Sequence, residues 1–256
     1  MSNKATIIAV TGKGGVGKTS LSAAIVRQLV KNFPDKRILA IDADPAVGLS
    51  TSLGVEVKHT IDDIRKAVIE NVENGNSKEA IEILNEAKYR IFDAMEELDG
   101  YAFIAVGRPE SAGCYCKINS YLKEIIGILS KEFDYVVIDG EAGIEQINRR
   151  VMQKVTHLIL VTDASKKGRD VCATIKSVAD ELVMYDRIGV IVNRLNDKSL
   201  LSLMDFKGVP VLACIGEDKN LAEFDLKGEN VFDLPDGSEL VRGADSALEE
   251  IGILKK

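Results

Sequence analysis

The chain has 256 residues, of which 46% are hydrophobic and 29% charged, as in an ordinary globular protein that forms one large α/β domain. No apolar run has the length of a membrane span and the first residues lack the features of a signal peptide, so we expect a cytoplasmic protein without a membrane partner. A formal net charge of −7 without a basic block argues against a nucleic-acid partner, and four cysteines in such a chain do not make a disulfide framework.

A glycine-rich stretch near the start of the chain lies between a predicted strand and a predicted helix. The apolar segment 5–10 predicts a buried parallel strand, and apolar residues spaced by three and four from Leu21 predict a helix. The stretch between them reads Gly12-Lys13-Gly14-Gly15-Val16-Gly17-Lys18-Thr19 and matches the P-loop pattern G-x-x-x-x-G-K-S/T. Glycines let backbone N–H groups wrap an anion, and we expect Lys18 to reach the β- and γ-phosphates and Thr19 to ligate Mg²⁺. The sequence therefore predicts a nucleoside triphosphate site, in which we include Ser20.

Two carboxylates follow the next predicted strand, which covers residues 37–41. Asp42 and Asp44 lie at the carboxyl end of a parallel strand, on the side of the P-loop, where ligands of such sheets bind. The alternative is a pair of aspartates that only start the turn before Pro45. Residues 60–98 then predict two helices, and we interpret the region from about 56 to 100 as a helical insertion that serves as scaffold or faces a partner.

A pair of cysteines follows the predicted strand 101–106. Cys114 and Cys116 flank one residue, and in an extended backbone both sulfurs can face one ion. The start of the next predicted helix would lower the thiol pKa values and favour the thiolate form that binds metal. Two thiolates make half of a four-ligand site, and a twofold axis between two such loops would supply the missing pair. The alternative is two packed, inert thiols.

A strand predicted over residues 134–139 ends in a carboxylate, the pattern of a Walker B segment. We expect Asp139 to hold Mg²⁺ through water. In the following residues 140–143 the glycines, Gly143 among them, would let backbone N–H groups approach the γ-phosphate. The alternative is a strand that simply ends in a turn.

The second half of the chain predicts strands over 157–162, 187–192 and 210–216 and a closing helix over about 240–251. Asn193-Arg194 follows the second of these strands, and an amide there can donate to and accept from an adenine edge, unless Asn193 is an ordinary cap of the strand end. We expect Cys172 and Cys214 to be buried in the core. The predicted fold class is α/β, a single P-loop NTPase domain over 1–256 with a mostly parallel central sheet of about seven strands and helices on both faces.

The P-loop contains a second lysine, Lys13, and this makes it resemble a variant motif of a known family. With Lys13 and Lys18, residues 12–19 resemble the deviant Walker A motif of the family that contains the partition ATPases, MinD and nitrogenase iron protein. The resemblance implies that ATP joins two chains in a homodimer, with Lys13 reaching across the twofold interface to the nucleotide of the other subunit. It further implies that Asp44 positions the attacking water in switch I, that switch II follows Asp139, and that Asn193 reads the adenine base.

Within that family the chain most resembles the nickel-insertion accessory ATPases of carbon monoxide dehydrogenase, the CooC type. The residues responsible are the double-lysine P-loop, Cys114-Tyr115-Cys116 and the stretch 139–145. The resemblance implies that paired C-x-C motifs hold one Ni²⁺ or Zn²⁺ and that ATP turnover delivers nickel to carbon monoxide dehydrogenase or acetyl-CoA synthase.

Two other functions stay open at this point. An iron–sulfur-carrying reductase ATPase like nitrogenase iron protein would carry a cysteine in switch II, and residues 141–143 contain none. A partitioning or positioning ATPase that cycles on membranes would end in a basic amphipathic helix, whereas Arg242 is the only basic residue of segment 238–252.

Overall fold

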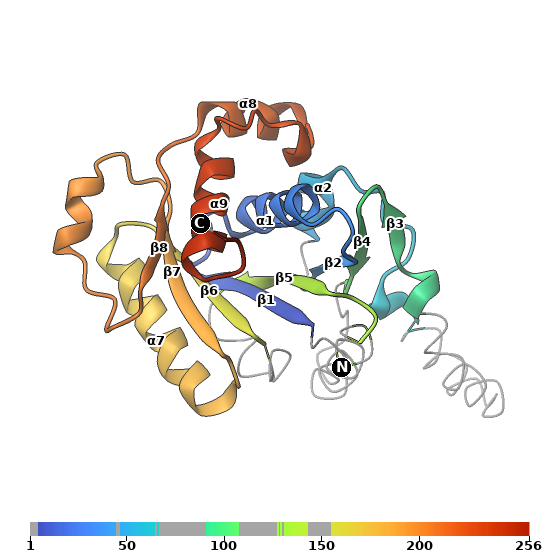
Figure 1. Cartoon of the computed structure of the whole chain (residues 1–256), viewed down its shortest axis with the longest axis horizontal. Helices are drawn as coiled ribbons and strands as arrows, with labels where there is room; N and C mark the ends of the chain where they lie inside the picture. Colours follow the sequence, from blue (N-terminus) through green and yellow to red (C-terminus); the bar gives the residue numbers. More distant parts are fainter. Residues whose placement is uncertain are drawn as a thin grey trace.

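In the computed structural model, the described residues are 5–44, 47–64, 66, 91–107, 127, 129, 131–142 and 155–255. They form one eight-stranded sheet in the order β3-β4-β2-β5-β1-β6-β7-β8 (Figure 1). The strands are β1 (Thr6–Gly12), β2 (Ile38–Asp42), β3 (Glu96–Leu98), β4 (Tyr101–Ala105), β5 (Tyr135–Ala142), β6 (His157–Thr162), β7 (Arg187–Val192) and β8 (Val211–Cys214). Every strand pair is parallel except β3–β4, so the predicted α/β class and the mostly parallel sheet are confirmed.

Helices cover both faces of this sheet, and Figure 1 shows α1 and α9 on one face and α7 on the other. The α-helices are α1 (Lys18–Asn32), α2 (Gly48–Leu53), α7 (Lys166–Leu182), α8 (Lys219–Lys227) and α9 (Glu239–Glu250), and η1 (Lys198–Leu203) and η2 (Val231–Asp233) are 3₁₀-helices. Within the part of the chain that the structure describes, no helix has both the length and the apolar character needed to cross a bilayer.

The central strands are buried on both faces, which explains their unbroken apolar sequences. Side chains of a strand alternate between faces, so in β1 Ile7 and Ala9 belong to the core under α7, whereas Ile8 and Val10 belong to the core under α1. Cys172 on α7 is 4% exposed and lies in the first of these cores, as predicted.

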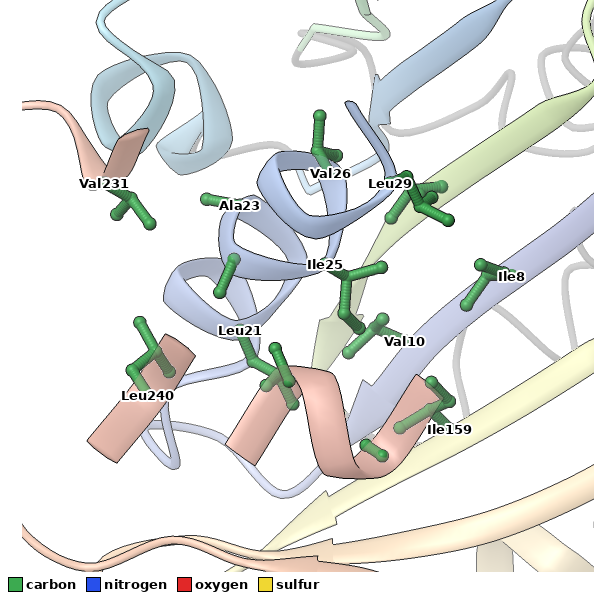
Figure 2. Close-up of a cluster of buried hydrophobic side chains, with 14 of the residues drawn as sticks. Ile8, Val10, Leu21, Ala23, Ile25, Val26, Leu29, Ile159, Val231 and Leu240 are labelled. Atoms are coloured by element: carbon green, nitrogen blue, oxygen red, sulfur yellow. The ribbon is translucent and has the colours of Figure 1, made fainter. Parts of the chain in front are cut away.

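Helix α1, which begins at the P-loop, is fixed to the sheet by its apolar side. Leu21 and Ile25 are fully buried, and Figure 2 shows them between β1, Ile159 of β6 and Leu240 of α9. Burying one such side chain contributes about 1.5–3 kcal/mol, so this contact holds the first turn of α1 in a fixed place. A loop that ends in such a helix is well suited to bind phosphate without much rearrangement.

The prediction that residues 60–98 are helical was wrong at its end. Residues 61–64 and 91–93 are helical, but Glu96–Leu98 forms β3, an antiparallel edge strand that pairs with β4. Asp99-Gly100 makes the hairpin turn, with Gly100 at a φ of 84°, and Asp-Gly between apolar residues is a strong hairpin signal. The sheet therefore has one strand more than the seven that were predicted. The helices predicted between residues 67 and 90 lie outside the described residues.

Candidate nucleotide site

The P-loop connects β1 to α1, and its glycines meet two different needs. Gly12 has a φ of 147°, and a Cβ there would come within 2.0 Å of the Val161 carbonyl oxygen of β6. Gly15 and Gly17 have φ values of 73° and 87°, which side chains other than glycine rarely adopt. No described atom lies within 4 Å of the Cβ position of Gly15, so the loop faces open space there. These features form a backbone cradle of the kind that binds anions through its N–H groups.

The two lysines of the loop point to different places. The Lys18 side chain is buried, and its Nζ donates to the Lys13 carbonyl oxygen at 3.3 Å, across the inside of the loop. The Lys13 side chain instead forms an ion pair with Asp163, directly after β6, and lies 3.4 Å from the hydroxyl of Ser165. Although partial burial acts to raise the pKa of Asp163, the hydrogen bonds from Lys13 and Ser165 hold it below its usual value. The Lys18 side chain thus stays within its own loop, whereas the Lys13 side chain reaches the residues just before α7.

Asp42 is the last residue of β2, Asp139 lies three residues before the end of the neighbouring strand β5, and the two are paired in register in the middle of the sheet. Both are fully buried. One Asp139 oxygen accepts from the Ser22 hydroxyl at 3.0 Å, and the other accepts no hydrogen bond from the described residues. Burial raises the pKa of Asp139 to about 6, against hydrogen bonds from Thr19 and Ser22 and the positive charge of Lys18.

The Asp42 carboxylate is fully engaged with backbone N–H groups. It accepts from Asp44 at 3.1 Å and from Leu49 at 2.8 Å. Burial, and after it the Asp139 carboxylate, raises the pKa of Asp42 to about 7. Asp44 is close enough to raise the pKa values of both buried carboxyl groups, so the structure brings Asp42, Asp44 and Asp139 together as their positions after parallel strands predicted.

The residues at this point fit a magnesium ion. Asp139 presents a buried oxygen without a hydrogen-bond partner among the described residues, and the Thr19 hydroxyl lies within hydrogen-bond reach of the same carboxylate. Carboxylate and hydroxyl oxygens are the ligands that Mg²⁺ uses beside nucleotide phosphates. Bound there, Mg²⁺ would neutralise phosphate charge during transfer.

A cleft of about 450 Å³ opens beside Gly17 and Ser20, between the ends of β7 and β8 and the helices α8 and α9. Asn193 and Arg194 line it, as do residues that the sequence did not single out, namely Ile215, Gly216, Glu217, Asp218, Leu221 and Leu240. Residues 215–218 lie at and directly after the carboxyl end of the predicted strand 210–216, and this position could have identified these four, because ligands bind at the carboxyl ends of parallel strands.

The Asn193 amide supports the P-loop from this cleft. Its Nδ2 donates to the Val16 carbonyl at 2.8 Å and its Oδ1 accepts from the Arg194 N–H at 2.9 Å. An amide retains one further hydrogen and one further lone pair, so it can still meet the edge of a base. Arg194, in a left-handed conformation with a φ of 58°, donates from its guanidinium to the Gly15 carbonyl at 3.2 Å. Both residues thus tie the cleft to the phosphate cradle.

Three predicted site residues, Cys114, Cys116 and Gly143, lie outside the described residues. Among the residues that are described, no group of three or more His, Cys, Asp or Glu side chains could hold a metal ion. The described part does show where the segment with the cysteines begins, because the Val106 N–H donates to the Asp42 carbonyl at 2.9 Å, at the same sheet edge as the P-loop. Cys214, predicted to be buried, is only partly buried.

Comparison with known proteins identifies a nucleotide-binding family. Residues 7–231 match the family model described as CobQ/CobB/MinD/ParA nucleotide binding domain. The chain is 37% identical over 249 residues to an uncharacterized ATP-binding protein of Methanocaldococcus jannaschii, covering 96% of this chain and 98% of the relative. It is 30% identical over 187 residues to the carbon monoxide dehydrogenase accessory protein CooC of Rhodospirillum rubrum, covering 68% of this chain and 69% of the relative.

The fold agrees as well. The crystal structure of the cell division ATPase MinD of Pyrococcus furiosus matches with a TM-score of 0.68 at 23% identity, over 98% of each chain. From its P-loop, its paired carboxylates and its family match, the chain belongs to the CobQ/CobB/MinD/ParA nucleotide-binding family and is an ATP-binding ATPase of the MinD/ParA class.

Proposed function

We propose that this ATPase is a metallochaperone of the CooC kind. Two chains associate around ATP, hold one Ni²⁺ or Zn²⁺ between their Cys114 and Cys116 thiolates, and deliver nickel to an enzyme such as carbon monoxide dehydrogenase or acetyl-CoA synthase. In this proposal residues 1–256 act as one ATPase domain, and the metal is cargo, separate from the magnesium that accompanies ATP. The relative named as a carbon monoxide dehydrogenase accessory protein supports this choice of client.

The observation that carries the proposal is where the cysteine segment leaves the sheet. Strand β4 lies beside β2, and Val106 is hydrogen-bonded to Asp42, whose side chain binds the backbone of residues 44 and 49. Cys114 follows Gly107 by seven residues, which span at most about 25 Å when fully extended. At most this length of chain separates Cys114 from a residue at the nucleotide edge, which supports coupling between nucleotide state and metal binding.

The same proposal assigns a role to each residue at the nucleotide. Lys18 contacts the β- and γ-phosphates, Lys13 those of the second chain, and Asp44 orients the attacking water for hydrolysis to ADP and phosphate. Thr19 and Asp139 hold Mg²⁺. Backbone N–H groups of the cradle, and that of Gly143 at the γ-phosphate, supply further positive dipoles, and Asn193 and Arg194 bind the base. Phosphoryl transfer needs mainly positioning and charge stabilisation, which these groups can supply.

Metal analysis with stoichiometry tests the metallochaperone proposal. Protein loaded with Ni²⁺ or Zn²⁺ in the presence of ATP and freed of excess ion should hold one ion for every two chains. The double variant Cys114→Ser/Cys116→Ser should hold none. The matched control Cys172→Ala/Cys214→Ala removes the other two thiols of the chain and should keep the ion, because Cys172 lies in the core and Cys214 in β8. A wild-type protein without stoichiometric metal, or an ion retained by the first double variant, would contradict the proposal.

The same samples separate the two alternative functions. An iron–sulfur carrier would turn brown and absorb visible light after anaerobic reconstitution with iron and sulfide. A positioning ATPase would sediment with anionic vesicles or DNA in the presence of ATP. Helix α9 carries Glu239, Asp245, Glu249 and Glu250 but a single basic residue, so we expect no such sedimentation.

A further inference from the structure

Asp42 occupies a fixed point at the centre of the nucleotide edge. It is the last residue of β2, between β4 and β5, and is fully buried. Its carbonyl accepts from the Val106 N–H at 2.9 Å, and the next N–H, that of Ala43, donates to the Asp139 carbonyl at 3.0 Å. The backbone around Asp42 is therefore held from both neighbouring strands.

Both carboxylate oxygens of Asp42 bind the segment that follows. One accepts from the Asp44 N–H and the other from the Leu49 N–H in the first turn of α2. These two amides lie in the switch I segment, of which the structure describes residues 43, 44 and 47–49. The carboxylate thus holds this segment at both of its ends.

The switch I segment also contains a residue in a rarely adopted conformation. Val47 has a φ of 51°, although β-branched side chains seldom occur in the left-handed region. Such conformations persist where the surrounding structure imposes them. The Val47 N–H donates to the Asp44 carbonyl at 3.0 Å, a further contact between the two positions that Asp42 binds. Asp42 binds the backbone on both sides of Val47, at Asp44 and at Leu49.

We propose that Asp42 is a positioning residue for ATP hydrolysis, which fixes switch I so that the Asp44 carboxylate faces the phosphate end of the site. Asp42 acts through the backbone of Asp44 and Leu49 and does not itself contact the nucleotide. Asp44 directly follows Ala43, whose N–H donates to the Asp139 carbonyl at 3.0 Å, so it lies at the same sheet edge as the P-loop. A small displacement of switch I would misplace the group that orients water, and such displacements reduce the rate of a positioned reaction strongly.

The variant Asp42→Asn tests this role with little change in volume. An amide has one accepting oxygen, so it can accept from Asp44 or from Leu49 but not from both, and its NH₂ group opposes the other N–H. We expect kcat to fall at least tenfold, with KM for ATP and the affinity for ADP within threefold of wild type. Saturating Mg²⁺ should not restore kcat. Because nucleotide affinity reports on folding of the site, this split separates positioning from a general loss of structure.

Asp62→Asn is the matched control. Asp62 is as deeply buried, lies near the same sheet edge through its N–H bond to the Val106 carbonyl, and pairs with Lys66 instead of switch I. The kcat of Asp62→Asn should stay within twofold of wild type.

Three results would overturn the proposal. They are a kcat of Asp42→Asn within twofold of wild type, a rise in KM that accounts for the whole loss, and recovery of kcat at high Mg²⁺, which would make Asp42 an electrostatic part of the metal site. If Asp42→Asn does not fold, amide hydrogen exchange in the wild-type protein decides the question. The N–H groups of Asp44 and Leu49 should exchange slowly, and fast exchange at both would show that the carboxylate does not hold switch I.

Discussion

Lys13 is bound within its own chain, to Asp163 and Ser165 at the start of α7. This ion pair is partly exposed, with about a quarter of the Lys13 side chain accessible, and exposed pairs contribute at most about 1 kcal/mol. A phosphate of a second chain can therefore compete for this lysine at little cost in stability. The residue is thus available for the interface role that the proposed dimer requires.

We predict that Lys13→Ala abolishes ATP-dependent association and leaves the chain folded. The apparent dimer dissociation constant should rise at least tenfold, whereas ATP affinity at low protein concentration should stay within threefold, because Lys18 serves the phosphates of its own chain. Sedimentation velocity with a non-hydrolysable ATP analogue measures the first quantity and calorimetry the second. Lys36→Ala, which breaks the surface pair with Asp134 at the opposite sheet edge, is the control. Association of Lys13→Ala equal to that of wild type would exclude the interface role.

The buried pair Asp42 and Asp139 predicts a pH dependence of stability. Their pKa values of about 7 and about 6 lie above the usual 3.8, so the folded protein binds more protons than the unfolded chain between these limits. Their contribution to stability is complete below about pH 4 and is lost as the pH rises to about 7. One pKa unit corresponds to about 1.4 kcal/mol.

Urea unfolding without nucleotide or Mg²⁺ measures this contribution. From pH 5 to pH 8 the unfolding free energy of wild type should fall by roughly 2 kcal/mol more than that of Asp42→Asn, which lacks the titrating group. Carboxylates with lowered pKa values, such as Asp134 and Asp163, change stability with pH in the opposite direction. They are present in both proteins, so their effect drops out of the difference between the two. Parallel pH profiles for the two proteins would show that Asp42 titrates normally.

At the scale of secondary structure, Asp218 joins two helices beside the cleft. One of its oxygens accepts from the N–H groups of Asn220 and Leu221 and caps α8, while the other accepts from Leu240 in the first turn of α9 and from the Ser238 hydroxyl. Losing one helix cap costs about 1 kcal/mol. The side chain therefore stabilises both helix starts at once.

We predict that Asp218→Ala lowers the unfolding free energy by about 2 kcal/mol and also weakens ATP binding, because α8 and α9 form one wall of the cleft. Denaturant unfolding and calorimetry measure the two effects. Asp197→Ala is the matched control, since Asp197 caps only η1, in which no residue is buried, and its cost should stay below about 1 kcal/mol. An equal loss of unfolding free energy in the two variants would mean that the link between α8 and α9 adds nothing to stability.

The sequence predicted the elements whose signals are local. Central strands buried on both faces read as continuous apolar runs, and each of the seven that were predicted is present. β3 was missed because Met95 and Leu98 also fit a helical spacing, whereas its strand state depends on pairing with β4. Helix α8 was not predicted, although Asp218 is a normal helix cap.

The candidate site divides in the same way. The P-loop and the carboxylates Asp42, Asp44 and Asp139 were predicted because a parallel sheet gathers the carboxyl ends of its strands at one edge. The contact of Lys13 with Asp163 joins residues 150 positions apart and depends on β1 lying beside β6. No local sequence pattern predicts such a pair. The same holds for the hydrogen bond from the Asn193 amide to the Val16 carbonyl.

At the scale of the molecule, the strand order sets which loops can influence each other. The neighbours β4, β2, β5 and β1 lead respectively into the segment with the cysteines, switch I, the residues after Asp139 and the P-loop. Hydrogen bonds of Asp42 and Ala43 to Val106 and Asp139 cross these strands just where they end. A movement of switch I on ATP binding or hydrolysis would therefore act directly on the start of the cysteine segment.

This arrangement predicts that ATP and the metal ion change each other's affinity by the same factor. If nucleotide binding alters the dissociation constant of Ni²⁺ or Zn²⁺, the ion must alter that of the nucleotide equally, because both factors describe one coupling free energy. We expect a factor of at least about 5, in the range usual for coupled sites. Titrations of the ion with and without a non-hydrolysable ATP analogue, and of the analogue with and without the ion, give the two factors. In Cys114→Ser/Cys116→Ser the ion should leave nucleotide affinity unchanged. A factor of one in both directions would remove the coupling and leave an ATPase whose turnover does not govern its metal.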